Sequence, residues 1–475
     1  MSRRKLLGLT TSGAALAAAP FISCSQRKTD IPSNIIFMVA DGMSLGVPSL
    51  VEPFSRMLKQ KGTQWHSIAR RPQTTHGFFD MASLNSLVTD SSAASSSWGS
   101  GSRVNNRAVN TLPDGTKLKP IGHIAKEAGY RVGLVTTTRL THATPAGFLS
   151  STPHRNREDE IATQYLGYGD VLMGGGLRHF DGSKRKDNLD LTSKYKQQGF
   201  QVIKNRNELK NLNQNQVLGL FSNSHLPYSL DLLQSEKQQS QVPTLAEMTQ
   251  AALKILASKP FLLQIEAGRV DHAAHANDAA ALLHEQLAFD DAIEVAKHFA
   301  DERNDTLVVI TTDHGNANPG LNGYGDGYTQ TNSHFERILK IKESFAMMQQ
   351  DLKTIFKAKG VVPKTEVLDR VLTGSSIELS SIEAGKLADT FQIQLQVNQF
   401  DWNQQHGNFT GLLGQMLGNH VGIQWTGATH TADLAPLMAI GPGRERFNGL
   451  LRNTEAFKIL SQFMGSNYRN PRSTQ

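Results

Sequence analysis

Four short runs of apolar, largely β-branched residues constrain the fold most, because each one ends abruptly in polar residues. The runs lie at 35–40, 132–135, 261–265 and 307–310. A continuous apolar run of this length is typical of a strand buried on both faces, and such strands form parallel sheets. The sequence therefore predicts a parallel sheet that is covered on both sides.

Helical patterns lie between these runs, as at 121–129 and 282–299. Strands that alternate with helices indicate a doubly wound α/β fold, in which a mostly parallel central sheet is flanked by helices. Ligands of such folds bind beyond the carboxyl ends of the strands. The residues found at these positions are Asp41, Glu266, Asp313 and His314. We therefore expect the functional site at that edge of the sheet.

Two regions interrupt the alternation of strands and helices. Residues from about 181 to 245 are rich in Asn, Gln and Lys, which predicts a polar surface excursion. Residues from about 317 to 425 begin with a glycine-rich stretch, and their apolar residues from Ile338 to Ile355 recur at steps of three and four, which predicts one amphipathic helix. Ser380 and Glu383 form a capping-box pattern that opens another helix. We expect a largely helical insertion late in the chain, within a single α/β domain at 30–475.

The first 24 residues have the layout of a twin-arginine export signal. Arg3 and Arg4 precede an apolar, alanine-rich run at 9–19. We therefore expect export by the Tat machinery to the periplasm or another extracytoplasmic location. Cys24, the only cysteine, follows a stretch that loosely resembles a lipoprotein processing site, so either a lipid anchor at Cys24 or a thiol in a discarded peptide fits the sequence.

The basic balance of the chain comes largely from this signal. The chain has 49 basic and 42 acidic residues, a formal net charge of +7, and removing Arg3, Arg4 and Lys5 leaves about +4. Nucleic-acid binding depends on a large, concentrated positive charge that neutralises phosphates. We therefore expect no nucleic-acid-binding role.

The segment from Glu266 to His275 carries a metal-binding pattern. Asp271 and His275 are four residues apart and would share one face of a helix that follows the strand ending at Glu266. A carboxylate and an imidazole one turn apart form a common half-site for zinc. The competing interpretation is a solvated helix start, where acidic residues are favoured in any case.

Further candidate ligands follow other strands, and their combination is more specific than each one alone. Asp41, Asp313 and His314 lie at strand ends, and His430 precedes a further strand-like run. A single acid at such a place is often only a helix cap. Together these aspartates and histidines, without cysteine, favour a hydrolytic site with two metal ions. Arg155 is a candidate clamp for an anionic substrate, although a lone arginine is more often a surface charge.

The stretch at 87–102 contains so many serines that its composition alone is typical of a flexible linker. It can also be interpreted as a short extended lead, a helix N-cap at Asp90 or Ser91, and the first turns of a helix. A serine at a helix N-terminus faces free N–H groups and the positive end of the helix dipole, which suits attack on a phosphate. Such a serine needs a metal or a base beside it to become reactive. Ser91 and Ser92 both remain candidates at this point.

The motifs together resemble those of the alkaline phosphatase family, and they occur in the family's order. The resemblance covers residues of about 33–345 and 425–465, with weak support within the insertion. Two further stretches, at 170–176 and 218–227, add similarity. The motifs that carry it are Ala40-Asp-Gly-Met43, Val88-Thr-Asp-Ser-Ser-Ala-Ala94, His142-Ala-Thr-Pro-Ala146, the segment Glu266 to His275, Thr312-Asp-His314 and His430-Thr431.

The resemblance implies a role for each matching position. It implies that Ser91 is the nucleophile, that Arg155 grips the phosphate oxygens, and that His142 and His272 help to bind the substrate. It further implies two zinc ions and one magnesium ion. The implied ligands are Asp271, His275 and His430 for the first zinc, Asp41, Asp313 and His314 for the second, and Thr144 and Glu266, with Asp41 bridging, for magnesium.

The expected activity is hydrolysis of phosphate monoesters through a phosphoserine, with inorganic phosphate as a product. Two features depart from the patterns of some family members. His142 and His272 stand where some bacterial members carry Asp and Lys, and Ser92 replaces the alanine that usually follows the nucleophile. The insertion before His430 is longer than in compact members, and a homodimer is left open.

Two other functions compete with this interpretation. A phosphodiesterase of the same superfamily would share the Asp-Gly and Asp-His-Gly strand ends. An exported binding protein without catalysis would keep the fold alone. The complete set of ligands with a nucleophile argues against the second. Arg155 together with the implied magnesium ligands argues against a phosphodiesterase, because the phosphate of a diester has no third free oxygen for such a clamp to hold.

Overall fold

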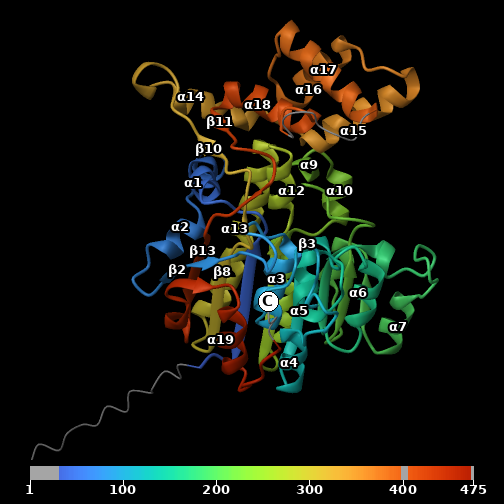
Figure 1. The fold of residues 1–475 in the computed structure, drawn as a ribbon, viewed down its shortest axis with the longest axis vertical. Helices are drawn as coiled ribbons and strands as arrows, with labels where there is room; N and C mark the ends of the chain where they lie inside the picture. The colour runs from blue at the N-terminus through green and yellow to red at the C-terminus, as the bar shows by residue number, and fades with distance from the viewer. Residues whose placement is uncertain (1–30, 397–404, 472–475) are drawn as a thin grey trace, which may run out of the picture.

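A computed structural model of the chain describes residues 31–396 and 405–471. The expected export signal at 1–24, with Cys24, lies outside these residues. Within the described part of the chain, no helix combines the length and the apolar character needed to cross a membrane. Figure 1 shows helices packed around a central sheet, and a second group of helices beyond one end of it.

The central sheet has ten strands in the order β14-β2-β13-β8-β1-β7-β3-β4-β6-β5. It is mostly parallel, and β13 is antiparallel to both of its neighbours. The predicted α/β class with a mostly parallel central sheet is confirmed. The strands are β1 (Asn34–Ala40), β2 (Thr75–Asp80), β3 (Arg131–Arg139), β4 (Val171–Gly175), β5 (Gln201–Ile203), β6 (Val217–Leu220), β7 (Phe261–Ala267), β8 (Thr306–Thr311), β13 (Ala435–Ile440) and β14 (Gly449–Arg452).

Helices cover both faces of the sheet because the side chains of each central strand alternate between two cores. In β1, Ile36 and Met38 belong to one core, whereas Ile35 and Phe37 belong to the other. The first core is covered by α1 (Gly46–Lys59), α2 (Gln64–Ala69), α11 (Leu245–Leu256), α12 (Arg269–His275) and α13 (Ala279–Asp301). The second is covered by α3 (Ser91–Ser100), α4 (Ile121–Glu127), α5 (Ala143–Leu149), α6 (Glu158–Gln164), α7 (Leu191–Gln197) and α19 (Glu455–Phe463).

The segment at 181–245, which we expected to be a surface excursion, contributes the two strands at one edge of the sheet. All four residues of β6 are buried, and β5 pairs with β6 in parallel. Long polar connections flank these short strands, so the average composition of the segment hides them. The other elements there are α7, α8 (Arg206–Lys210), α9 (Ser229–Leu232) and α10 (Glu236–Gln241).

The late insertion is largely helical and forms the orange upper part of Figure 1. The single amphipathic helix predicted from Ile338 to Ile355 is wrong, because the chain breaks after a short 3-10 helix and α15 begins only at Phe345. The Ser344 hydroxyl caps α15 by accepting from Met347 N at 3.2 Å. The helical elements of the insertion are η2 (Asp326–Tyr328), α14 (Thr331–Phe335), η3 (Glu336–Lys340), α15 (Phe345–Lys359), α16 (Lys364–Ser375), α17 (Ser381–Gln396) and α18 (Phe409–Val421).

The predicted capping box at the start of α17 is confirmed. Ser380 N donates to the Glu383 carboxylate at 2.8 Å, and Glu383 N donates to Ser380 Oγ at 3.2 Å. Four short strands form two small antiparallel pairs near the insertion. They are β9 (Gly315–Asn316) with β12 (His430–Thr431), and β10 (Gly320–Leu321) with β11 (Ile423–Gln424). Two further 3-10 helices are η1 (Leu177–His179) and η4 (Arg444–Phe447).

Two buried carboxylates anchor the insertion to the α/β core. Asp278 accepts from Ala281 N at 3.0 Å, which caps α13, and from Phe345 N at 2.6 Å, at the start of α15. Asp231 accepts from Ser344 N at 2.8 Å and from its hydroxyl at 2.7 Å. Burial raises the pKa of Asp278 to about 7. The insertion is therefore held at its first long helix by core residues.

Candidate active site

The predicted site residues meet at the carboxyl edge of the central strands. Asp41 follows β1, Glu266 lies near the end of β7, and Asp313 and His314 follow β8. His430 comes from β12, which pairs with β9 just after His314. These segments are far apart in sequence, and the parallel sheet brings their ends together. The candidate metal ligands fall into three groups of neighbouring side chains.

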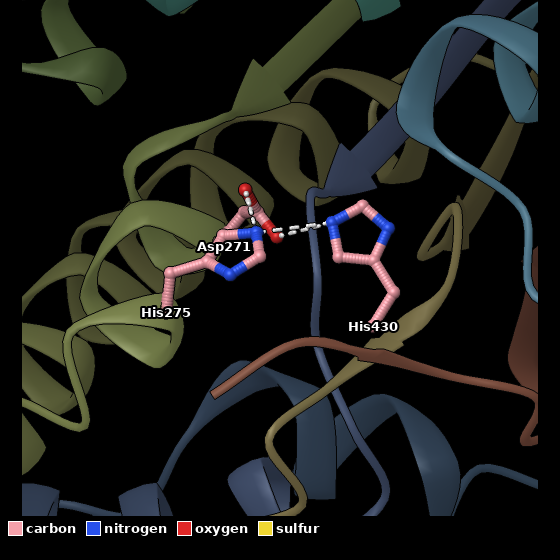
Figure 2. A group of neighbouring side chains, drawn as sticks. All are labelled: Asp271, His275 and His430. Atoms are coloured by element: carbon pink, nitrogen blue, oxygen red, sulfur yellow. Dashed lines mark hydrogen bonds and ion pairs between the residues drawn. The ribbon is translucent and has the colours of Figure 1, made fainter. Parts of the chain in front are cut away.

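The first group consists of Asp271, His275 and His430, shown in Figure 2. His275 Nδ1 donates to the Ala428 carbonyl at 2.8 Å, and His430 Nδ1 donates to the Thr89 carbonyl at 2.9 Å. Because a carbonyl only accepts, the proton of each neutral ring is on Nδ1 and the lone pair is on Nε2.

The two Nε2 atoms lie 3.1 Å apart, and each is 3.5 Å from an oxygen of Asp271. Burial, followed by the charge of His314, lowers the pKa of His430 to about 4, which keeps its ring neutral. Two lone pairs that face each other beside a carboxylate repel unless a cation lies between them. This donor set of two nitrogens and one carboxylate fits zinc.

The second group consists of Asp41, Asp313 and His314, all fully buried. His314 Nε2 lies 3.1 Å from Asp313 Oδ2 and 3.6 Å from Asp41 Oδ1. Neither oxygen of Asp41 has a hydrogen-bond partner. Burial, followed by the charge of Asp313, raises the pKa of Asp41 well above its usual range. Buried carboxylates without partners fit a cation held between them.

Gly42 lies between the first two groups, and its lack of a side chain lets them come close together. Its φ is +71°, and a Cβ added there would lie 2.6 Å from Asp271 Oδ1. Only glycine permits both this backbone conformation and this contact. Gly42 N also donates to Asp313 Oδ1 at 2.9 Å, which fixes the orientation of that carboxylate. The turn after β1 therefore positions ligands of both groups.

The third group contains Glu266, Asp41 and His142, with Thr144. One oxygen of Glu266 accepts from the Thr138 hydroxyl at 3.0 Å and from the Thr136 hydroxyl. Its other oxygen and Thr144 Oγ1 are buried without hydrogen-bond partners. Burial raises the pKa of Glu266 to about 7. These oxygen donors suit a hard cation such as magnesium, and His142 adds a nitrogen at the same place.

The structure distinguishes the two candidate serines. Asp90 is the N-cap of α3 and accepts from Ala93 N at 2.9 Å, so Ser91 is the first helical residue. Ser91 Oγ is buried and lies 3.2 Å from His314 Nε2. Ser92 Oγ instead donates to the two oxygens of Asp90 at 2.9 and 2.8 Å. Ser91, and not Ser92, therefore faces the candidate metal ligands.

The serine-rich stretch is a buried helix and not a linker. All ten residues of α3 are buried, and most of its other serine hydroxyls donate to backbone carbonyls of the preceding turn. Small side chains let α3 lie against α5, where a Cβ on Gly99 would be 2.0 Å from the Gly147 carbonyl oxygen. The small residues therefore allow the close packing that sets Ser91 in place.

Arg155 lies between Asp90 and His142. Its Nη1 donates to Asp90 Oδ2 at 3.0 Å, and its Nη2 lies 3.1 Å from His142 Nε2. Burial tends to raise the pKa of Asp90, but the charge of Arg155 and the hydrogen bonds outweigh burial and lower it. Asp90 thus both caps the helix of Ser91 and holds the guanidinium beside it.

Three residues near this site were missed by sequence reasoning: His225, Arg139 and Arg269. The His225 ring centroid lies 5.3 Å from that of His142 and 4.5 Å from that of His272. His225 belongs to the matched stretch at 218–227, which is a signal that could have found it. It was missed because β6, which precedes it, lies in the segment that we expected at the surface.

Comparisons with known proteins agree with this geometry. The family model described as alkaline phosphatase matches residues 32–466. Alkaline phosphatase 4 of Bacillus subtilis is 32% identical over 460 residues, which cover 92% of this chain and 90% of that protein. Alkaline phosphatase 3 of the same organism is 30% identical over 481 residues, covering 98% and 96%. The crystal structure of the Thermus thermophilus alkaline phosphatase matches with a TM-score of 0.85 and 32% identity, covering 97% of this chain and 98% of that one.

Proposed function

The chain belongs to the alkaline phosphatase family and is a phosphomonoester hydrolase, and on that premise we propose that it acts through a phosphoserine on Ser91. The observation that carries this proposal is the position of Ser91 Oγ, 3.2 Å from His314 Nε2 at the start of α3. A hydroxyl at this place meets a candidate metal ligand, and Asp90, the residue before Ser91, accepts from the guanidinium of Arg155.

The residues present fit two zinc ions and one magnesium ion. Asp271, His275 and His430 would hold the first zinc, on the side of the leaving group. The second zinc, beside Ser91, would be held by Asp41, Asp313 and His314, and magnesium by Thr144 and Glu266 with Asp41. When bound, these ions supply Lewis-acid charge that favours deprotonation of a neighbouring hydroxyl and stabilises the leaving oxygen.

The chain itself positions the substrate and the nucleophile. Arg155 grips two oxygens of the phosphoryl group through its planar fork, with His142 and His272 nearby as further contacts. Ser91 Oγ loses its proton and attacks phosphorus, the bond to the alcohol oxygen breaks, and the alcohol leaves with a proton. Water then attacks the phosphoserine, inorganic phosphate leaves, and Ser91 Oγ regains a proton.

A monoester and its matched diester distinguish this proposal from a phosphodiesterase. We expect kcat/KM to be about ten- to a hundredfold higher for the monoester, because a lost charge-assisted contact costs about 1.5–3 kcal/mol. Metal analysis of the same sample should give two zinc ions and one magnesium ion per chain. A diester preference would favour the phosphodiesterase, and hydrolysis of neither ester by the metal-loaded protein would favour a binding protein.

Arg155→Ala is expected to lower kcat/KM for monoesters by about ten- to a hundredfold and to weaken inhibition by inorganic phosphate similarly, because a charge-assisted contact is lost. The matched control is Arg157→Ala, because Arg157 is exposed and, among the residues that the structure describes, forms an ion pair only with Glu160, at 3.6 Å. Steady-state kinetics with phosphate as inhibitor measure both effects. Unchanged phosphate inhibition in Arg155→Ala would show that the clamp lies elsewhere.

We further propose that the protein is exported by the Tat machinery to the periplasm or another extracytoplasmic location. Arg3 and Arg4 before the apolar run support this proposal. Changing both to lysine should block export, so that phosphatase activity is found in the cytoplasmic fraction. Unchanged export would contradict the proposal.

Mass spectrometry of the mature N-terminus distinguishes a lipid on Cys24 from removal of the peptide. Light scattering of the mature protein tests the homodimer.

A further inference from the structure

The carboxyl edge of the sheet carries a second cluster of charged side chains beside the proposed active site. We call it the cationic shelf and define it as Arg139, Arg178, His225 and Arg269. These residues end or follow β3, β4, β6 and β7, which are neighbours in the order β7-β3-β4-β6. Most candidate metal ligands lie over the neighbouring strands β8, β1 and β7, and His142 and Thr144 follow β3 at the boundary. The edge therefore places an acidic half next to a basic half.

His142 and His272 connect the shelf to the phosphate clamp. Arg155 Nη2 lies 3.1 Å from His142 Nε2, and the His142 ring lies 5.3 Å from that of His225 and 5.6 Å from that of His272. Arg269 Nη1 lies 2.9 Å from His272 Nδ1. The shelf therefore begins one side chain away from Arg155. Arg155 would hold the reacting phosphoryl group, and a second anionic group on a flexible alcohol portion would have to extend from there towards His142 to contact the shelf.

Two of the shelf's guanidinium charges lack a carboxylate partner. Arg139 is neutralised by Glu158, which accepts from its Nε at 2.7 Å and from its Nη2 at 2.8 Å. Among the described residues, by contrast, no carboxylate forms an ion pair with Arg178 or Arg269. Arg178 Nε donates to His179 Nε2 at 3.0 Å, and the His179 ring lies beside Glu158 and Asp159. Arg269 instead lies over the ring of Tyr228, with its Cζ 3.7 Å from the centroid.

The nearest acids to Arg269 already have partners of their own. Asp231 binds Ser344, and Glu285 accepts from Ser229 N at 2.5 Å. Both sense the charge of Arg269, which lowers their pKa values against the larger raising effect of burial. They therefore offset its charge through space without occupying its donors.

The histidines of this region suit an anion and not a further metal ion. A guanidinium can only donate, so His272 accepts from Arg269 on Nδ1 and carries its proton on Nε2. Both ring nitrogens of His225 instead face donors of Arg139: Nε2 faces Nη1, and Nδ1 lies 3.4 Å from the backbone N. The Nε2–H of His272, beside guanidinium groups without carboxylate partners, forms a surface for a negatively charged group.

We propose that the cationic shelf binds a second anionic group, a phosphate or carboxylate, on the alcohol portion of the substrate. The physiological substrates are then monoesters whose leaving alcohol itself carries a negative charge. This inference rests on the proposed function, because it takes Arg155 and Ser91 as the site of the reacting phosphoryl group. It goes further, because it names the class of leaving group.

The test compares two matched series of substrates with the metal-loaded enzyme. One series consists of α,ω-alkanediol bisphosphates and the other of the corresponding ω-hydroxyalkyl monophosphates, with chains of two to six carbons. The readout is the ratio of their kcat/KM values, in which a general loss of activity cancels. We expect a ratio of at least about tenfold at the best chain length, which falls as salt screens the charges.

Arg178→Gln is the main variant because Arg178 is distant in sequence from every proposed metal ligand. It should lower the ratio towards the factor of about two that two equivalent phosphates give by statistics alone. Arg269→Gln should lower it as well. Arg157→Gln removes the same charge from an exposed arginine that lies outside the shelf, and it should leave the ratio unchanged. A series of ω-carboxyalkyl phosphates then shows whether carboxylates bind equally well.

Two outcomes would overturn the shelf as a subsite. One is a ratio near two at every chain length in the unaltered enzyme. The other is a raised ratio that neither Arg178→Gln nor Arg269→Gln lowers. Hydrolysis of neither series would instead contradict the proposed function, so the two failures are distinguishable. Thermal unfolding of each variant confirms that it is folded before its ratio is interpreted.

Discussion

Replacing Ser91 by alanine is expected to lower kcat for monoesters by at least about 10³-fold, because it removes the nucleophile. Ser92→Ala is expected to retain most of the activity. Ser92 Oγ donates to Asp90, and losing that hydrogen bond costs about 1 kcal/mol, which loosens the residue that holds Arg155. The two variants differ by one position on the same helix, so each is the other's control.

Covalent trapping checks the same assignment by a different measurement. When the enzyme is quenched in acid during turnover, mass spectrometry should find the phosphoryl group on the peptide that contains Ser91. Ser91→Ala should abolish this modification, and Ser92→Ala should retain it. If Ser92→Ala alone lost both the activity and the modification, the nucleophile would be Ser92 and not Ser91.

Removal of the metal ions is expected to have the second large effect, on both activity and stability. Each ion that binds only the folded protein stabilises it by about 4 kcal/mol when its free concentration is a thousand times Kd. Chelation should therefore abolish monoester hydrolysis and lower Tm. Adding back zinc and magnesium should restore both.

The loss of stability on metal removal should grow with pH. Burial raises the pKa of Glu266 to about 7 from its ordinary 4.5, so the folded protein without metal binds this proton more tightly than the unfolded chain does. That contribution, about 3 kcal/mol, is present below pH 4.5 and is lost as pH rises through about 7. Asp41, whose pKa is also raised, acts in the same direction.

Thermal unfolding between pH 5 and 9 measures this effect, with and without metal. Above about pH 6.5, where buried histidines such as His272 and His430 with lowered pKa values no longer add stability as the pH rises, Tm of the metal-free protein should fall. Tm of the loaded protein should change much less, because cations replace the protons. Glu266→Gln should flatten the metal-free profile. A Tm that chelation leaves unchanged at alkaline pH would contradict the view that cations hold these buried carboxylates.

Much of the α/β architecture was predictable because its central strands are buried on both faces. β1 and β8 appear in the sequence as uninterrupted apolar runs, a signal that a surface segment does not imitate. The same signal located the candidate ligands, since Asp41 and Asp313 come directly after those runs. Parallel strands place their carboxyl ends together, so residues that follow different strands could be expected to lie side by side although they are far apart in sequence.

Other features depended on tertiary contacts that no local pattern contains. Ser91 and Ser92 look alike in sequence, and only the bond from Ser92 to Asp90 separates them. The spacing from Ile338 to Ile355 continues across a break, because the fixed start of α15 at Ser344 overrides the periodicity. His225 follows a four-residue strand that polar connections hide. In each case a partner that is distant in sequence, or a short element, decides the structure.

The carboxylate of Asp278 caps two helices at once at the junction between the core and the insertion. One oxygen closes the start of α13 and the other closes the start of α15, while Asp231 holds Ser344 beside them. Asn277, the residue before Asp278, also accepts from Gln405 Nε2 at 2.8 Å, so the chain returns to the same corner of the core before α18. Any replacement of the helices between Ser344 and His430 therefore has to preserve two attachments to the core, one at each end of the replaced segment.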